Sequence, residues 1–280
     1  MTDRSALPDA SPENSVSELI KKIAAAASAG IDWIQIREKD LSAKQLAALT
    51  HQALQAAQRH KLQPVHPSSP DPSQQGADQW RRLQPVQRST PDPTQQEGKP
   101  ADQSHSLEPV QRSNASPNLQ PTTRPIASTR ILINDRLDIA IAERAHGVHL
   151  GESSTPPSDA LRVIHSAQQK GLVSDDFLLG VSCHCLESAK SAQAAGVDYI
   201  IFGPIFPTPS KAVFGEPQGL TRLGELCRVI SIPILAIGGI TLDNASACLN
   251  SGAAGIAAIR LFQDSADLAS VCRLIRSSSP

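Results

Sequence analysis

The residues with the clearest chemical potential stand where a short apolar run ends near the amino end of the chain. Within Trp33 to Lys39, period-two alternation places Gln35, Arg37 and Lys39 on one side. An amide and two cations on one side are hydrogen-bond donors that suit a polyphosphate. A salt-bridged strand end is the alternative, but an inward arginine there would lack a partner. We therefore predict an anion-binding site at this strand end.

A second polar group ends the next apolar run. Asn134 and Asp135 follow Ile131 to Ile133. Mg²⁺ usually takes one or two carboxylates together with phosphate oxygens, so Asp135 alone could suffice once a diphosphate is bound. An Asn-Asp pair by itself is more often a turn. The predicted metal site therefore depends on the cations expected nearby.

Hydroxyl groups and glycines follow the later apolar runs. The stretch from Gly203 to Lys211 is a proline-stiffened loop that presents the hydroxyls of Thr208 and Ser210 and the ammonium of Lys211. Gly238 and Gly239 follow the next run, and a further glycine-containing turn precedes the last one. Glycine lets a phosphate approach backbone N–H groups closely. These segments predict phosphate binding.

Two histidines stand near these positions. His184 follows an apolar run and is a candidate proton carrier near neutral pH, although a structural role is at least as common for a histidine at a loop start. The spacing of Cys183, His184 and Cys185 cannot place three ligands around one metal without strain. His149 lies inside an apolar run, which favours a buried histidine behind the site.

The elements that must position these residues alternate between short apolar runs and alanine-rich amphipathic stretches, the pattern of repeated βα units. Helices are predicted at 17–29, 42–60 with Ser42 as its cap, 187–195 and 242–251. Seven strands are predicted, at 33–37, 131–134, 147–150, 178–182, 199–202, 234–237 and 255–259. The predicted fold is an α/β, (β/α)8 TIM barrel that lacks most of its first strand, because only Met1 to Arg4 precede the first helix. Either the true start lies upstream or the fold has an open seam.

The middle of the chain has a different composition. From Leu62 to Thr129 it is dominated by Pro, Gln, Ser, Asp and Thr, and it repeats Leu-Gln-Pro-Val at Leu62 and Leu83 and Leu-Glu-Pro-Val at Leu107. Such a segment has too few apolar residues to repay the entropy of ordering its backbone. We predict three parts: residues 1–61 as the first part of the barrel, 62–129 as a low-complexity disordered insertion, and 130–280 as the remainder of the barrel.

Charge and cysteine content exclude several classes of protein. The net charge of −1 provides no general attraction to nucleic acid or an anionic membrane. The five cysteines lack the paired spacing of a zinc site and are expected to be buried free thiols. There is no apolar run of 18 residues and no apolar core of a signal peptide, so we expect a cytoplasmic protein with small-molecule substrates, no nucleic-acid or membrane partner and possible homo-oligomers.

Six segments taken together resemble the thiamine phosphate synthase family. They are QIREKD from Gln35, INDR from Ile133, GVHLG from Gly147, GVSCH from Gly180, DYIIFGPIFPTPSK from Asp198 and AIGGIT from Ala236. The resemblance covers both flanks of the insertion, and Thr2-Asp3-Arg4 is similar to the end of that family's first strand.

The resemblance implies a transferase that couples hydroxymethylpyrimidine diphosphate with thiazole phosphate, forms thiamine phosphate and releases pyrophosphate with Mg²⁺. It implies that Gln35, Arg37, Lys39 and Asn134 hold the diphosphate, that Asp135 binds Mg²⁺ and that Lys211 neutralises the departing pyrophosphate. Ser182 would face the pyrimidine, and Thr208 and Ser210 the thiazole. Gly239 and the backbone at Ile259 and Arg260 would bind the thiazole phosphate.

The chain departs from the family's pattern at two positions. Ser154 stands where a second Mg²⁺-binding aspartate is expected, and Arg260 stands where a small residue is expected. The missing carboxylate keeps open a thiazole tautomerase of the same superfamily, with His184 as acid and base. A non-catalytic protein that presents its Pro-rich repeats to a partner is the alternative of another class.

Overall fold

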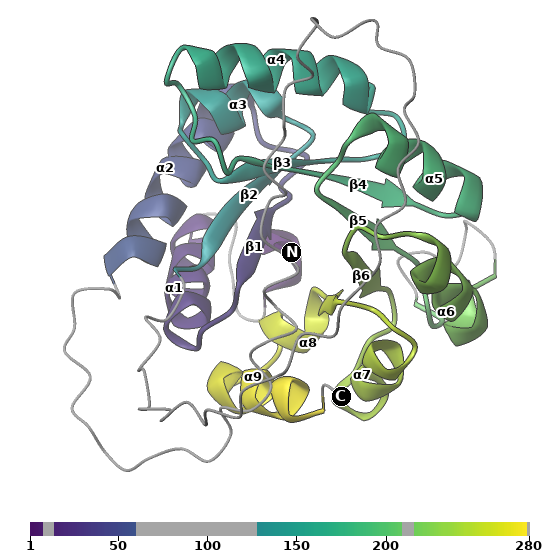
Figure 1. The fold of residues 1–280 in the computed structure, drawn as a ribbon. Helices are drawn as coiled ribbons and strands as arrows, with labels where there is room; N and C mark the ends of the chain where they lie inside the picture. Colours follow the sequence, from purple (N-terminus) through teal and green to yellow (C-terminus); the bar gives the residue numbers. More distant parts are fainter. Residues whose placement is uncertain (8–13, 60–127, 209–215, 279–280) are drawn as a thin grey trace, which may run out of the picture. The chain divides into compact units, whose positions relative to one another are not determined.

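The computed structural model describes residues 1–7, 14–59, 128–208 and 216–278. Seven parallel strands form one curled sheet in the order β1 to β7 (Figure 1). Their bounds are β1 (Trp33–Ile36), β2 (Arg130–Asn134), β3 (Gly147–Leu150), β4 (Leu178–Cys183), β5 (Tyr199–Phe202), β6 (Ile234–Ile237) and β7 (Gly255–Ala257). The seven predicted strands are therefore confirmed. The last one ends two residues early, because Ile259 has helical backbone angles and caps the next helix.

Helices alternate with the strands and surround the outside of the curled sheet (Figure 1). They are η1 (Arg4–Ala6), α1 (Ser15–Ser28), α2 (Ala43–Arg59), α3 (Leu137–Ala142), α4 (Pro157–Gln169), α5 (Leu186–Ala195), α6 (Gly219–Val229), α7 (Leu242–Asn250), α8 (Arg260–Gln263) and α9 (Leu268–Ser277). The predicted cap at Ser42 is confirmed, since its hydroxyl accepts from the Gln45 amide at 3.3 Å and Gln45 Oε1 accepts from the Ser42 amide at 3.0 Å.

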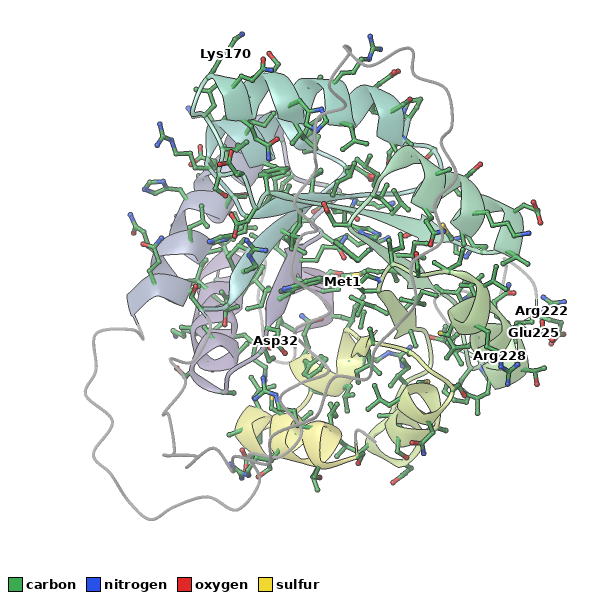
Figure 2. All side chains as sticks on the ribbon, in the orientation of Figure 1. Met1, Asp32, Lys170, Arg222, Glu225 and Arg228 are labelled. Atoms are coloured by element: carbon green, nitrogen blue, oxygen red, sulfur yellow. The ribbon has the colours of Figure 1, made fainter. Side chains whose placement is uncertain are left out.

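Two apolar clusters fill the two faces of the sheet. The larger one lies between the strands and the helices and includes Ile34, Ile133 and Ile200. The smaller one includes Leu132, Tyr199 and Leu235 from alternate strand positions, so it lies on the inner face of the curl. Charged helix residues such as Lys170 and Arg222 point outward (Figure 2). Strands buried on both faces explain the nearly continuous apolar runs in the sequence.

The sheet is open between β1 and β7 in the part of the chain that the structure describes. The first residues of the chain bridge this opening at the carboxyl edge, and Arg276 of α9 bonds the Gly30 carbonyl just before β1. The Thr2 amide donates to the Gln35 carbonyl at 2.8 Å, and the Met1 amine donates to the Ala258 carbonyl at 3.4 Å. We call this opening the seam. An open seam is one of the two arrangements that the sequence predicts.

The connection between α2 and β2 begins and ends at the amino edge of the sheet. The hydroxyl of Thr129 donates to the Ile31 carbonyl at 2.7 Å, and the Arg130 amide donates to the Asp32 carbonyl at 2.9 Å. Helix α2 runs back from the carboxyl edge to this same edge, as a βα unit requires. The predicted insertion at 62–129 lies outside the described residues, except for its last two positions.

The cysteines are partly as expected. Cys183, Cys248 and Cys272 are buried free thiols, whereas Cys227 is half-buried and Cys185 is exposed. The expectation of burial is wrong for Cys185 because it is the N-cap of α5, where its sulfur accepts from the Ser188 amide at 3.4 Å. None of the described helices has the length and apolar character needed to cross a membrane.

Candidate active site

The predicted site residues gather at the carboxyl edge of the sheet. Parallel strands all end at one edge, so Gln35, Asn134 and Ser182 share it. The contacts of Met1 and Thr2 bring the ends of β1 and β7 to the same place. Thr2 bonds Gln35 at the end of β1, and its neighbour Met1 bonds Ala258 just after β7. One residue pair thus lies between the two strand ends, which sets them about two strand spacings apart, roughly 10 Å.

A chain of hydrogen bonds links the ends of β1, β2 and β3. The Gln35 side-chain amide donates to Asn134 Oδ1 at 2.8 Å, and the Asn134 amide donates to Asp135 Oδ2 at 2.7 Å. Asp135 Oδ1 accepts from the Gly151 backbone amide at 3.1 Å and from the hydroxyl of Ser154. The chain fixes the orientation of Asn134 and Asp135, which the sequence places at the mouth.

Asp135 is held as a carboxylate. Burial acts to raise its pKa, but the hydrogen bonds from Ser154 and Gly151 and the positive charge of Lys39 outweigh burial, so the pKa lies below its usual value. Its φ of 61° is in the left-handed region that Asn and Asp tolerate best. The backbone therefore turns sharply here and presents the carboxylate to the edge.

Arg37 and Lys39 lie just beyond β1. The structure gives neither side chain a hydrogen bond or ion pair within the described residues. The carboxylates beside them are used elsewhere: Glu38 Oε2 accepts from Arg4 Nη1 at 3.1 Å, and Asp40 also pairs with Arg4. A salt-bridged strand end thus exists, but its cation is Arg4. Arg37 and Lys39 remain available to an anion.

The inner face behind the site carries a polar triad in which the histidine and the tyrosine are buried and the serine is half-buried. His149 Nε2 lies 2.9 Å from Ser182 Oγ, and His149 Nδ1 lies 3.2 Å from the Tyr199 hydroxyl. Burial lowers the pKa of His149 to about 4 against the opposing charge of Asp135, and burial raises the pKa of Tyr199 well above its usual value. Both groups are neutral near pH 7. The placement of His149 behind the site agrees with the sequence interpretation.

Glycine is required beside this triad. A Cβ on Gly180 would collide with the Tyr199 ring, which lies between Trp33 and His149. Tyr199 also packs against Trp33, with ring centroids 4.8 Å apart. Gly180 therefore leaves the space in which the Tyr199 ring reaches across to His149.

The loop after β5 packs on the glycine turn after β6. The Ile205 amide donates to the Ile237 carbonyl at 2.8 Å, and the Phe206 amide donates to the Gly238 carbonyl at 3.0 Å. Gly238 and Gly239 have φ of 98° and 64°, and a Cβ on either would lie within 2.6 Å of this loop. Thr208 ends the described part of the loop. Ser210 and Lys211 lie outside the described residues.

The remaining predicted phosphate contacts lie past β6 and β7. The Gly239 carbonyl accepts from the Asn244 side chain at 2.9 Å, which anchors the glycine turn to the first turn of α7. Ile259 and Arg260 begin α8, and the Arg260 side chain is exposed. The bond of Met1 to neighbouring Ala258 places this strand end beside the end of β1.

His184 has a defined tautomer. Its Nδ1 lies 2.5 Å from the Gly203 carbonyl oxygen, which can only accept, so Nδ1 carries the hydrogen. In the neutral ring, Nε2 is then left as an acceptor. His184 is half-buried and joins the loops after β4 and β5.

Sequence reasoning missed the part that Thr2 plays. Its hydroxyl donates to Glu38 Oε1 at 2.6 Å and accepts from the Arg37 amide at 3.0 Å. The buried Glu38 also accepts from the Arg4 amide at 3.1 Å. The amino end of the chain therefore holds the loop that carries Arg37 and Lys39. The sequence shows a glutamate between two cations, Arg37 and Lys39, but no local pattern connects it with Thr2.

Ser154 contacts Asp135 directly, so the position that departs from the family's pattern lies in the site. Glu152, the carboxylate nearest to Ser154 in the sequence, is exposed. In the described ranges, no group of three or more His, Cys, Asp or Glu side chains could hold a metal ion. Asp135 is the carboxylate that the arrangement offers to a cation.

Comparison with known proteins decides the family. The family model described as thiamine monophosphate synthase matches residues 108–262, more than half of the chain. The chain belongs to this family. A putative thiamine-phosphate synthase of Geobacter sulfurreducens is 47% identical over 130 residues, which are 46% of this chain and 57% of the relative. A thiamine-phosphate synthase of Methanocella arvoryzae is 42% identical over 151 residues, 54% of this chain and 67% of the relative.

The match to the Geobacter relative thus spans less than two thirds of that protein's length. Among solved structures, thiamine phosphate pyrophosphorylase from Pyrococcus furiosus superimposes with a TM-score of 0.61 and 20% identity. The superposition covers 99% of this chain and 92% of that one. At 20% identity the superposition shows that the two proteins share a fold, and it shows nothing about their activities.

Proposed function

We propose that this chain is a thiamine-phosphate synthase that couples hydroxymethylpyrimidine diphosphate with thiazole phosphate and releases pyrophosphate. The observation that carries the proposal is the hydrogen-bonded chain from Gln35 through Asn134 to Asp135, flanked by the available cations Arg37 and Lys39. A monophosphate isomerase would not need this set of groups. Family membership and the identities to the two named relatives support the same activity.

The proposed binding roles follow from the positions of the residues. Arg37 and Lys39 bind the diphosphate, and Gln35 and Asn134 orient it. Ser182, held by His149, faces the pyrimidine. Thr208 and Ser210 face the thiazole, and Lys211 neutralises the departing pyrophosphate. The thiazole phosphate is bound by Gly239 and by the backbone at Ile259 and Arg260. The finer fold that we propose is a (β/α)8 barrel with a place for one more strand at the seam.

The chemical step needs stabilisation of a leaving group. The bond between the exocyclic carbon of the pyrimidine and the diphosphate breaks, its electron pair leaves with pyrophosphate, and the carbon bonds to the thiazole. Negative charge grows on the leaving diphosphate, where fixed cations stabilise the transition state more than the ground state. Arg37 and Lys39 are placed for this role: neither side chain forms an ion pair within the described residues, although the charge of Lys39 acts on the nearby carboxylate of Asp135.

The residues at the site fit a magnesium ion. A carboxylate offers about four lone-pair positions. Asp135 accepts two hydrogen bonds at Oδ1 and one at Oδ2, which leaves one lone-pair position for a cation. Mg²⁺ characteristically completes such a site with water and substrate phosphate oxygens rather than further side chains. Bound Mg²⁺ would supply positive charge against the diphosphate oxygens.

A coupled assay tests the proposal. The purified chain is mixed with both substrates, with and without Mg²⁺, and pyrophosphate release is measured together with thiamine phosphate formation. We expect equal amounts of the two products and dependence on Mg²⁺. Release of no pyrophosphate, with isomerisation of a thiazole phosphate that His184→Ala abolishes, would replace the synthase with the tautomerase.

One observation favours that tautomerase as the second candidate. His184 keeps Nε2 as an acceptor because Nδ1 donates to the Gly203 carbonyl, the arrangement that a general base needs. In the non-catalytic alternative, the repeats that would bind a partner lie among residues that the structure does not describe. This function, the cytoplasmic location and homo-oligomers stay predictions.

A further inference from the structure

The loop after β1 carries opposite charges on neighbouring residues. Arg37 and Lys39 are the proposed diphosphate-binding cations, and Glu38 and Asp40 alternate with them in the sequence. A carboxylate beside a cation lowers the positive potential that an anion meets, and it can form an ion pair that competes with the anion. An anion site on this loop therefore requires a partner that keeps the two carboxylates from the two cations.

Arg4 engages both carboxylates at once. Its Nη1 donates to Glu38 Oε2 at 3.1 Å and to Asp40 Oδ1 at 2.7 Å, and its Nη2 donates to the other carboxylate oxygen of Asp40. The contact with Asp40 is bidentate, the geometry in which a guanidinium binds a carboxylate most specifically. The hydrogen bond from Arg4 lowers the pKa of Asp40 below its usual value, so Asp40 carries a negative charge near neutral pH.

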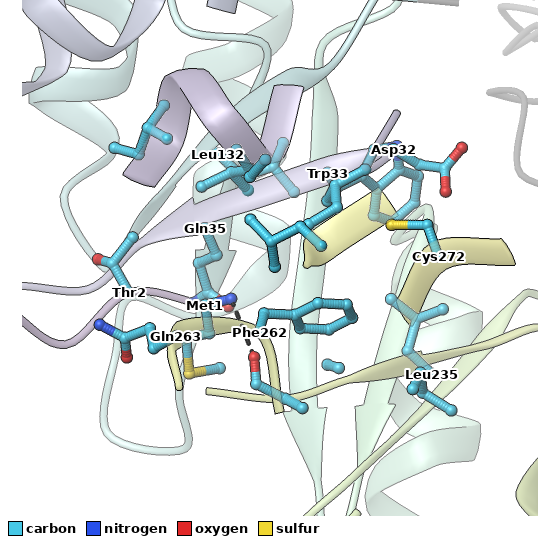
Figure 3. A pocket seen from close by; sticks show the side chains of 18 of the residues that line it. Met1, Thr2, Asp32, Trp33, Gln35, Leu132, Leu235, Phe262, Gln263 and Cys272 are labelled. Carbon is cyan, nitrogen blue, oxygen red and sulfur yellow. Dashed lines mark hydrogen bonds between the residues drawn. The ribbon is translucent and has the colours of Figure 1, made fainter. Parts of the chain in front are cut away.

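The two carboxylates differ in their surroundings. The Asp40 side chain is 70% exposed, whereas that of Glu38 is 3% exposed and also accepts from the Thr2 hydroxyl at 2.6 Å and the Arg4 backbone amide at 3.1 Å. Thr2 lies beside Gln35 at the end of β1 (Figure 3). These bonds would hold Glu38 in place without the Arg4 side chain. Its buried charge, screened little by water, would then act strongly on its neighbours.

We propose that Arg4 is a positioning residue of the diphosphate site, which pairs with Glu38 and Asp40 and thereby leaves the positive charges of Arg37 and Lys39 to the substrate. The inference rests on the proposed function, because the diphosphate is the anion that these two cations bind. Arg4 acts through the two carboxylates, since its Nη1 and Nη2 both bind them.

A purely structural role for Arg4 is the alternative. In that role, its side chain would only fasten the first residues of the chain to the loop. Thr2 provides further fastening, since its amide donates to the Gln35 carbonyl at 2.8 Å and its hydroxyl accepts from the Arg37 amide at 3.0 Å. The two roles predict opposite results when a carboxylate is removed from an Arg4 variant. Removal eliminates a freed negative charge, but it does not restore a lost fastening.

A double-mutant cycle separates the two roles. Calorimetry measures binding of inorganic pyrophosphate to the full chain in the parent, Arg4→Gln, Asp40→Asn and the variant with both changes. We expect Arg4→Gln to weaken binding by about threefold or more, because a freed carboxylate then opposes the anion. Asp40→Asn alone should change binding by less than about twofold, since Arg4 already neutralises that carboxylate, and the double variant should return to within about twofold of the parent.

Two further variants locate the effect. Arg4→Gln with Glu38→Gln removes the buried carboxylate and is a second rescue variant. Arg4→Gln with Glu18→Gln has the same net charge as the rescue variants, but Glu18 pairs with Lys21 on α1 at 2.8 Å, so binding should stay weak. Rescue by Asp40→Asn or Glu38→Gln, but not by Glu18→Gln, supports the proposal. Unchanged binding in Arg4→Gln, no rescue by either carboxylate change, or equal rescue by Glu18→Gln would overturn it.

Arg4→Lys takes the place of Arg4→Gln in the cycle if the latter does not fold, because one ammonium keeps the charge but lacks the fork that binds two carboxylates. Weaker binding that Asp40→Asn restores is again required. Arg37→Ala identifies the pyrophosphate site in the same assay. If Arg37→Ala weakens binding and Arg4→Gln does not, this inference fails and the proposed function stands. If neither change weakens binding, the proposed diphosphate site fails as well.

Discussion

His149 Nε2 lies 2.9 Å from the hydroxyl oxygen of Ser182, and the other nitrogen of the ring lies 3.2 Å from the Tyr199 hydroxyl. The imidazole is buried and uncharged, so one of its nitrogens donates and the other accepts. Tyr199 and Ser182 are thereby linked through one ring, and the orientation of Ser182 depends on a residue that does not itself lie at the mouth.

Replacement of His149 by Ala should lower kcat with the pyrimidine substrate by about tenfold or more and destabilise the fold by about 1 to 3 kcal/mol, because the buried Tyr199 hydroxyl and the half-buried Ser182 hydroxyl lose their partner. His149→Gln should restore part of both, since its amide can donate and accept. Urea unfolding and steady-state kinetics measure the two effects. Equal kinetics in the Ala and Gln variants would mean that His149 does not orient Ser182.

The buried His149 also predicts a pH dependence of stability. Its folded pKa of about 4 lies below the usual value of 6.5, so the unfolded chain binds the proton more readily. This contribution is fully present above pH 6.5 and is lost as the pH falls from 6.5 to 4, by on the order of 3 kcal/mol. Urea unfolding of the metal-free chain between pH 4 and 7.5 should show this loss, and His149→Gln should show a smaller one. Parallel pH curves for the two chains would contradict the prediction.

Arg37→Ala should weaken binding of the pyrimidine diphosphate by roughly 1.5 to 3 kcal/mol, about 10- to 150-fold in KM, because a charged hydrogen bond is lost. Arg162→Ala is the matched control, since that arginine pairs with Asp159 on the exposed side of α4. The control should leave KM unchanged. An unaltered KM in the Arg37 variant would remove this residue from the site.

Ser154→Asp places a second carboxylate beside Asp135. Two carboxylates at this distance repel, so the metal-free variant should be less stable than the parent, whereas Mg²⁺ should bind more tightly. Calorimetric titration with Mg²⁺ measures the affinity directly. Ser153→Asp, at the exposed neighbouring position, is the control and should bind Mg²⁺ as the parent does. No gain in affinity over this control would show that position 154 does not act on the metal.

Gly180→Ala should destabilise the fold by about 1 to 3 kcal/mol or more, because the added methyl group meets the Tyr199 ring. Gly224→Ala is the contrasting change: it lies within α6, its Cβ would meet only the Ser251 carbonyl at 3.6 Å, and alanine should stabilise the helix by about 0.5 to 1 kcal/mol. Thermal unfolding of both variants checks the opposite signs. A stable Gly180 variant would show that the Tyr199 ring can move away from His149.

The strands and the polar residues at their ends could be predicted because each apolar run ends at a polar residue that the parallel order brings to one edge. The contact of Ser154 with Asp135 could not be predicted, since it depends on the turn after β3, where Gly151 and Ser154 approach the sharp backbone of Asp135. The hydrogen bond between Tyr199 and His149 could not be predicted either, because it depends on the curl of the sheet and on the space left by Gly180. Arg4 lies thirty-four positions from Glu38, and no local pattern pairs them.

The long connection after α2 departs from and returns to the amino edge of the sheet, where Thr129 and Arg130 bind the backbone just before β1. All of the proposed chemistry belongs to the opposite edge. A change in the number of repeat units therefore leaves both anchor points of this connection at the edge of the sheet opposite to the strand ends that carry the proposed chemistry. The architecture thus separates the anchor points of the repeats from the proposed chemistry by the length of the strands.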